Sequence, residues 1–166
     1  MAISNYDRVS KVMDLLKVGL QPFVEREMKA QHKQLWLQEA RESVAETQAH
    51  LFTGSAEPEW DAASLLAVMW NQWEKVFRKT LGRAERSLIT ELRDARNKWA
   101  HQQTFSSDDA YRALDSAGRL LTAVSATPQA DEIEKMKMEL LRLRFDEQVR
   151  SEKRQVQRLR ALRQPI

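Results

Sequence analysis

The chain is poor in the residue types that make crosslinks and turns. It holds no cysteine, 4 glycines and 4 prolines in 166 residues. The absence of cysteine excludes disulfides and thiolate metal sites, and it is typical of proteins that work in a reducing cytoplasm. The scarcity of glycine and proline leaves little material for turns, so the composition favours long helices.

Long apolar runs and several enzyme signatures are also missing. No run of 18 or more apolar residues occurs, and residues 1–8 lack the apolar core of a signal peptide. We therefore expect no membrane span and a cytoplasmic protein. There is no glycine-rich phosphate loop, no His-Glu-x-x-His zinc motif and no Gly-x-Ser-x-Gly nucleophile elbow. We accordingly expect neither a bound metal nor an organic cofactor.

Charge is unevenly distributed along the chain. The whole formal excess of +3 falls in residues 131–166, which hold 10 basic and 7 acidic side chains. The end of this segment carries Arg150, Arg154 and Arg158 with only one acidic residue after position 148. Such a run can bind the phosphates of a nucleic acid, although a solvated helix face or linker is the simpler interpretation.

Hydrophobic periodicity predicts an all-α protein, a compact bundle of about five helices with a long charged C-terminal helix. Gly19 and Pro22 are expected to bend or divide the first helix, and residues 53–58 to end the second. We expect a bundle domain over residues 1–128 and a charged, basic-ended arm or linker over 129–166. The predicted helices span residues 5–30, 32–52, 61–81, 83–100, 109–125 and 129–162.

The fourth and sixth of these helices are patterned differently. In the fourth, an apolar stripe is expected to face the core, while Arg86, Arg93 and Arg96 lie away from it. In the sixth, a thin apolar seam changes phase near residue 145, which indicates a short coiled coil or a projecting arm. The fourth-helix stripe consists of Leu88, Leu92, Ala95 and Trp99; the two sixth-helix seams are Ile133, Met136, Leu140, Leu143 and Val149, Val156, Leu159.

The segment from Asp94 to His101 carries the most specific chemistry. Arg96 can hold a phosphate through its planar fork of donors, His101 can transfer protons near neutral pH, and Asn97 can orient either group. These three residues are the catalytic candidates for cutting RNA without a metal, through attack of the 2′-hydroxyl on the adjacent phosphate. Arg93 and Lys98 add positive potential for nucleic-acid binding.

Helix geometry limits how Arg96 and His101 can cooperate. Residues five apart are separated by about 140° around a helix and about 7.5 Å along it. The two side chains converge only if the helix ends between them, or if two copies of the segment face each other. The purely structural alternative is that Arg96 makes a surface ion pair and His101 caps the helix C-terminus.

The string from Leu92 to His101 resembles the signature of the HEPN superfamily, in which an arginine and a polar residue precede a histidine by a few positions. Residues 105–115 and 8–29 resemble flanking helices of one branch, so the resemblance covers most of residues 5–126. It implies a helical, commonly dimeric, metal-independent endoribonuclease with Arg96, Asn97 and His101 as its motif.

The same branch implies a biological setting. Its HEPN domain often precedes an ATPase or helicase-like region in bacterial anti-phage defence proteins, which the arm could join. One departure is that the tyrosine two residues after the histidine in the toxin group is Gln103 here. Some HEPN domains only bind RNA or partners. The alternative function is therefore a non-catalytic nucleic-acid-binding or dimerisation module attached to a defence ATPase.

Overall fold

The computed structural model describes residues 3–52 and 57–163, and all regular secondary structure in these ranges is helical. This confirms the predicted all-α fold. Its α-helices are α1 (Asn5–His32), α2 (Trp36–Glu42), α3 (Ala62–Asn71), α4 (Arg83–Ala100), α5 (Ser107–Ala123) and α6 (Thr127–Arg163). Short 3₁₀ helices, η1 (Lys33–Leu35), η2 (Glu46–Phe52) and η3 (Phe77–Lys79), connect some of them.

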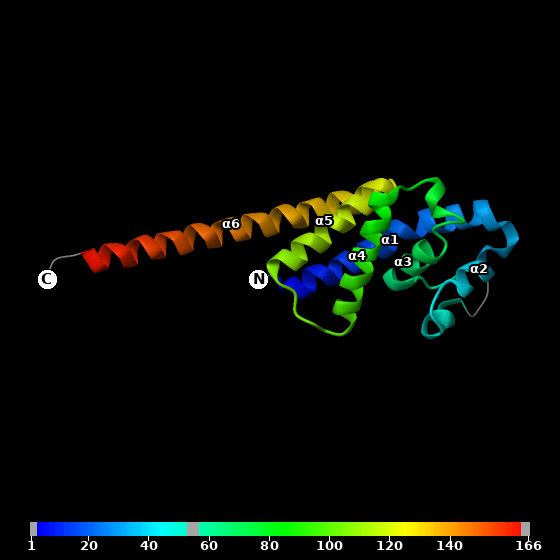
Figure 1. Ribbon diagram of the computed structural model, residues 1–166, viewed down its shortest axis with the longest axis horizontal. Helices are drawn as coiled ribbons and strands as arrows, with labels where there is room; N and C mark the ends of the chain where they lie inside the picture. Colours follow the sequence, from blue (N-terminus) through cyan, green and yellow to red (C-terminus); the bar gives the residue numbers. More distant parts are fainter. Residues whose placement is uncertain (1–2, 53–56, 164–166) are drawn as a thin grey trace.

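The long helix α1 is the centre of the bundle and packs against the other five α-helices (Figure 1). Helix α5 and the first part of α6 form an antiparallel pair along α1, and α4 packs between α5 and α3. The far part of α6 extends beyond the bundle, on the side where α5 begins (Figure 1). Helix α4 is therefore covered on three sides, by α1, α5 and α3.

Helix α1 runs unbroken through the two residues that were expected to disturb it. Pro22 lies inside the helix, so the division expected there does not occur. Gly19 has a packing role, because a Cβ atom at this position would lie 2.4 Å from Leu121 Cδ2 and 3.1 Å from the Cβ of Ala126. The absence of a side chain thus lets α1 approach the turn between α5 and α6 closely.

The predicted second and third helices are wrong in extent. The second is interrupted at Lys33, whose φ of 55° is left-handed, and it becomes η1, α2 and η2. Residues 53–56, part of its expected stop, lie outside the described residues. The third begins at Ala62, one residue after the predicted start, with Asp61 as its N-cap, but it ends at Asn71 instead of Leu81. Beyond it, Phe77 and Arg78 N–H groups donate to carbonyls five residues back (3.3 and 2.9 Å), so the regular pattern changes.

Helix α3 ends early because Gln72, directly after it, is a buried polar residue held by tertiary hydrogen bonds. The side chain of Gln72 is 5% exposed; its Nε2 donates to Ser43 Oγ at 2.8 Å and its Oε1 lies 2.9 Å from His32 Nε2. These tertiary bonds fix the position of Gln72 at the helix C-cap. These bonds leave no trace in the hydrophobic periodicity of residues 61–81, because both partners come from distant parts of the chain.

Helix α6 changes environment along its length. Ile133, Met136 and Leu140 are buried against the bundle, whereas Leu143, expected in the same seam, is 39% exposed and Phe145 is 68% exposed. Every residue from Ser151 to Arg163 is exposed. The first part of α6 therefore completes the core and the remainder is the long charged helix that was predicted. The domain boundary at residue 128 stays a prediction.

Two absences concern the residues that the structure describes. None of their helices combines the length and apolar character that a bilayer crossing requires. They also contain no group of three or more histidine or acidic side chains that could hold a metal ion.

Candidate functional site

Helix α4 carries the candidate catalytic residues, and its end is set by backbone hydrogen bonds. His101 is the C-cap, and Gln102 follows with a left-handed φ of 55°. The N–H of Gln102 donates to the carbonyl of Trp99 (3.0 Å), and that of Gln103 to the carbonyl of Lys98 (3.1 Å). This pair of bonds is the Schellman motif, which satisfies the last carbonyls of a helix. It places the candidate histidine where the helix stops.

The side of α4 that faces α1 is fixed by an aromatic anchor. Trp99 Nε1 donates to Ser10 Oγ at 2.7 Å, and the Tyr6 hydroxyl donates to the Trp99 carbonyl at 3.1 Å. The rings of Tyr6 and Trp99 stack with centroids 6.3 Å apart. Trp99 is thus a structural anchor, as its place in the apolar stripe indicated. Because it fixes the rotation of α4, it also fixes where Arg93, Arg96 and Asn97 point.

Those three side chains line a shallow hollow of about 190 Å³ between α4 and α3. Neither Arg96 nor Asn97 makes a side-chain hydrogen bond or ion pair with any described residue. No described residue therefore forms the surface ion pair that would have explained Arg96 structurally. A half-buried, uncompensated guanidinium beside an apolar wall is suited to hold an anion. The other lining residues are Ala45, Gln48, Ala63, Leu66 and Ala67.

His101 is exposed and is not among the residues that line this hollow. Its N–H still donates to the carbonyl of Asn97 at 3.1 Å, so the helical path continues to His101. The helix does not end early enough to bring the imidazole back beside Arg96, which was the first of the two expected routes. Asn97 precedes His101 by one turn on the same face and lies between the two groups.

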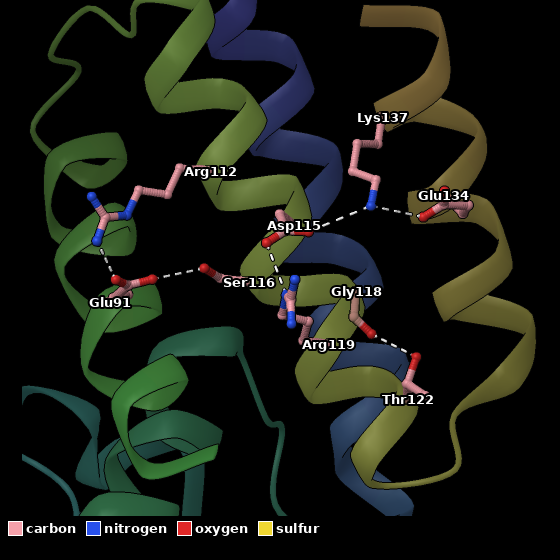
Figure 2. Close-up of polar contacts among 9 residues, drawn as sticks. All are labelled: Glu91, Arg112, Asp115, Ser116, Gly118, Arg119, Thr122, Glu134 and Lys137. Atoms are coloured by element: carbon pink, nitrogen blue, oxygen red, sulfur yellow. Dashed lines mark hydrogen bonds and ion pairs between the residues drawn. The ribbon is translucent and has the colours of Figure 1, made fainter. Parts of the chain in front are cut away.

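The α5-facing side of α4 has a different electrostatic character (Figure 2). Arg112 donates to Glu91, whose other oxygen accepts a 2.8 Å hydrogen bond from Ser116 Oγ. Lys98 pairs with Asp109 at 3.0 Å. The hydrogen bonds from Arg112 and Ser116 hold the pKa of Glu91 below its ordinary value, and the bond from Lys98 does the same for the pKa of Asp109. Basic groups on this side are therefore compensated by carboxylates.

Further compensated charges lie where α5 meets α6 (Figure 2). Arg119 and Lys137 contact Asp115 at 2.9 and 3.4 Å, and Lys137 also contacts Glu134 at 3.0 Å. Burial raises the pKa of Asp115, but the hydrogen bonds and charges of Arg119 and Lys137 outweigh this and lower it overall. This network ties α6 to the bundle and leaves no free cation in the region that Figure 2 labels.

The structure thus brings together only part of the set that the sequence proposed. Arg93, Arg96 and Asn97 share one hollow; Lys98 is on the opposite, compensated side of α4. The exposed Arg150, Arg154 and Arg158 lie on the extended part of α6, beyond the bundle (Figure 1). Their roles in nucleic-acid binding stay predictions.

The sequence did not predict the contact between Trp70 of α3 and the arginines of α4 beside the site. The guanidinium of Arg86 lies 4.9 Å from the ring centroid of Trp70, and that of Arg93 lies 5.9 Å from the same centroid. A signal was available, because Arg86 and Arg93 are seven residues apart on one helix face and α3 contains no charged residue. The contact itself required knowledge of how α3 and α4 pack.

An all-α bundle in which one helix, α4, ends in an arginine, an amide and a histidine is the arrangement expected of a HEPN domain. The family model described as Swt1-like HEPN matches residues 11–125, from within α1 to just beyond the end of α5. The chain belongs to this family, and the HEPN resemblance is confirmed. No curated protein and no solved structure matches the chain.

Proposed function

We propose that this chain is a metal-independent endoribonuclease domain that cleaves RNA by attack of the 2′-hydroxyl on the adjacent phosphate. The observation that carries the proposal is the uncompensated guanidinium of Arg96, which faces a hollow with Asn97 on a helix that ends at the exposed His101. The family match supports it, because many HEPN domains are ribonucleases. The setting that we propose is a bacterial anti-phage defence protein with an ATPase or helicase-like region.

Each candidate residue has a role that its chemistry allows. The 2′-oxygen forms a bond to phosphorus while the bond from phosphorus to the 5′-oxygen breaks, so a proton leaves the former and reaches the latter. His101 transfers a proton in this exchange. Arg96 donates to the non-bridging oxygens and stabilises the negative charge of the pentacovalent transition state. Asn97, between the two, orients the phosphate through its side-chain amide.

Because His101 does not line the hollow of its own chain, we propose that two copies complete the site. A twofold axis near the end of α4 would place His101 of one protomer beside Arg96 of the other. The same symmetry would give two equivalent sites in each dimer. This arrangement explains how a pair separated by about 140° around one helix can act on a single phosphate.

Complementation between two inactive variants tests the composite site. Arg96→Ala and His101→Ala are each expected to lose RNA cleavage. When the two are co-expressed, a mixed dimer keeps one complete site, so about a quarter of wild-type activity is expected for random pairing. The readout is cleavage of labelled RNA in the presence of EDTA, which also removes metal-dependent contaminants. Products should carry 2′,3′-cyclic phosphate and 5′-hydroxyl ends.

The outcomes separate the elements of the proposal. Equal cleavage by the wild type and both single variants would remove the nuclease assignment. Loss of activity in each variant without recovery in the mixture would keep the nuclease and reject the two-copy site. The same preparations run on a size-exclusion column with light scattering report whether the chain is a dimer.

A second candidate function is favoured by the distal part of α6. Residues 151–163 are exposed, and their apolar members Val156, Leu159 and Leu162 are 48%, 51% and 78% exposed. We propose that this arm docks the ATPase or helicase-like region, in which case the bundle is an assembly module. RNA binding would then be absent at moderate salt, although light scattering would still report a dimer.

A further inference from the structure

Three arginines of α4 form a line that the proposed cleavage does not fully use. Arg86, Arg93 and Arg96 share one face of the helix, and the ten residue steps from Arg86 to Arg96 cover about 15 Å along the axis. No carboxylate lies three or four residues from any of them, and the facing helix α3 carries no charged residue. We call Arg86, Arg93 and Arg96 the arginine track.

Trp70 of α3 contacts two members of this track, Arg86 and Arg93. Its ring lies 4.9 Å from the guanidinium carbon of Arg86 and 5.9 Å from that of Arg93, and Arg86 also lies 5.8 Å from the ring of Trp73. A guanidinium over an aromatic face is attracted by the ring but keeps its charge. Its donors lie in the guanidinium plane, so contact through the face leaves them available.

Several other arginines have carboxylate partners. Arg78 contacts Glu74 at 2.9 Å, Arg119 contacts Asp115 at 2.9 Å, and Arg112 and Arg144 contact Glu91 and Asp108. The side chains of the arginine track make no hydrogen bond or ion pair with a described residue. No described carboxylate compensates their positive charge, and an aromatic support restricts the orientation of Arg86 and Arg93. A preorganised site for several anionic groups has these properties.

We infer that the arginine track binds consecutive phosphates of a single-stranded RNA and leads the strand to the phosphate held by Arg96. This inference rests on the proposed nuclease function and adds the form of its substrate. Arg86 and Arg93 bind the phosphates of the flanking nucleotides. Trp70 is a positioning residue, because its ring holds the guanidinium groups of Arg86 and Arg93 in place. Since phosphate contacts carry no sequence information, the track itself confers no base preference.

The single-stranded form follows from the geometry of the cleavage. The attacking 2′-oxygen and the departing 5′-oxygen must lie in line through phosphorus, and a regular A-form duplex does not offer that alignment. A flexible strand can adopt it when neighbouring phosphates are held on a fixed row of donors. The track provides such a row over a length that exceeds one phosphate contact.

Binding of a short fluorescein-labelled 2′-O-methyl RNA tests the inference without cleavage, because this probe has no free 2′-hydroxyl. Fluorescence polarisation is measured over a range of salt concentrations with the full chain. The test variant is Arg86→Gln with Arg93→Gln. The matched control is Arg112→Gln with Arg119→Gln, which removes the same charge from exposed arginines that already have carboxylate partners.

The test variant is expected to bind at least tenfold more weakly than the wild type, since each lost contact is a charge-assisted hydrogen bond. Its slope of log affinity against log salt should fall by about 1.4, or about 0.7 for each phosphate contact to a single strand. The control should keep the wild-type slope. Trp70→Leu should weaken binding, whereas Trp70→Phe, which keeps a ring, should retain most of it.

The possible failures are distinguishable. If the test variant and the control bind alike with the same slope, the track is wrong, while loss of cleavage in His101→Ala would still support the nuclease. If the test variant binds weakly but the wild type never cleaves, the track holds and the nuclease does not. Equal affinity for the labelled strand and its duplex, or no binding by the wild type, overturns the track.

Discussion

The two sides of α4 place similar residues in opposite electrostatic situations. On the α5 side, Lys98 is paired with Asp109, and Glu91 accepts hydrogen bonds from α5. On the α3 side, Arg93 and Arg96 face helix α3, which has no charge. Paired charges fix how helices pack, whereas unpaired cations are available to a ligand. The distribution of carboxylates, more than that of arginines, therefore separates the structural side from the candidate binding side.

RNA cleavage should show the largest difference between the two sides. Arg96→Ala is expected to lower the cleavage rate by at least about 100-fold, because it removes a donor to the developing charge. Arg112→Ala, an arginine removed from the α5 side, should change the rate by less than about threefold, in the range of surface substitutions. Single-turnover cleavage with EDTA present measures both. Similar losses in the two variants would contradict the distinction.

The free energy of unfolding should depend more on the α5 side of α4 than on the α3 side. Glu91→Ala deprives Ser116, which is 3% exposed, of its acceptor and leaves Arg112 unpaired. We expect a loss of about 1–2 kcal/mol in the free energy of unfolding. Arg93→Ala breaks no ion pair and should cost less than about 0.5 kcal/mol. Urea denaturation followed by circular dichroism measures both losses. A larger loss for Arg93→Ala would contradict the structural role of the α5 side.

Acid should weaken the α5 side selectively. The pKa of Glu91 is lowered in the folded state from an ordinary value of 4.5. A carboxyl with a lowered folded pKa contributes stability above its unfolded pKa and loses it as pH falls through the folded value. Glu91→Gln should thus be less stable than the wild type at pH 7, by under about 1 kcal/mol because the pair is solvent-exposed. The difference should shrink below pH 4.5 in urea titrations at several pH values.

A substitution at the C-terminal end of α4 should change the stability of the protein without changing its rate of RNA cleavage. Gln102 has a left-handed φ of 55°, which glycine adopts without a steric penalty. Gln102→Gly is expected to raise the free energy of unfolding by about 0.5–1 kcal/mol. Thermal unfolding measures the gain, and the cleavage rate at a temperature where both proteins are folded is the control. A loss of cleavage would show that the Gln102 side chain belongs to the site.

Much of the fold could be predicted from the local sequence. The limits of α4 and the N-caps Asp61 and Ser106 agree with simple helix signals. The second and third helices were wrong because distant contacts determine them: Gln72 is fixed by Ser43 and His32, and no periodicity within residues 61–81 contains that information.

The site was predictable to a similar degree. The sequence identified Arg96, Asn97 and His101 as a motif, since their chemistry and spacing are local properties. It left open whether Arg96 and His101 converge within one chain, and it could not distinguish compensated Lys98 from uncompensated Arg93. That distinction depends on which carboxylates α5 contributes and on the absence of any from α3.

The amino-acid sequence alone determined the helical class, the limits of α4 and the residue types available for chemistry. These follow from periodicity, capping and side-chain functional groups, which act over a few residues. Only the tertiary structure decided which basic groups remain unpaired, where Trp70 lies and that His101 does not line the hollow of Arg96. Electrostatic compensation and aromatic contact depend on distances between helices, and those distances are set by the packing of the whole bundle.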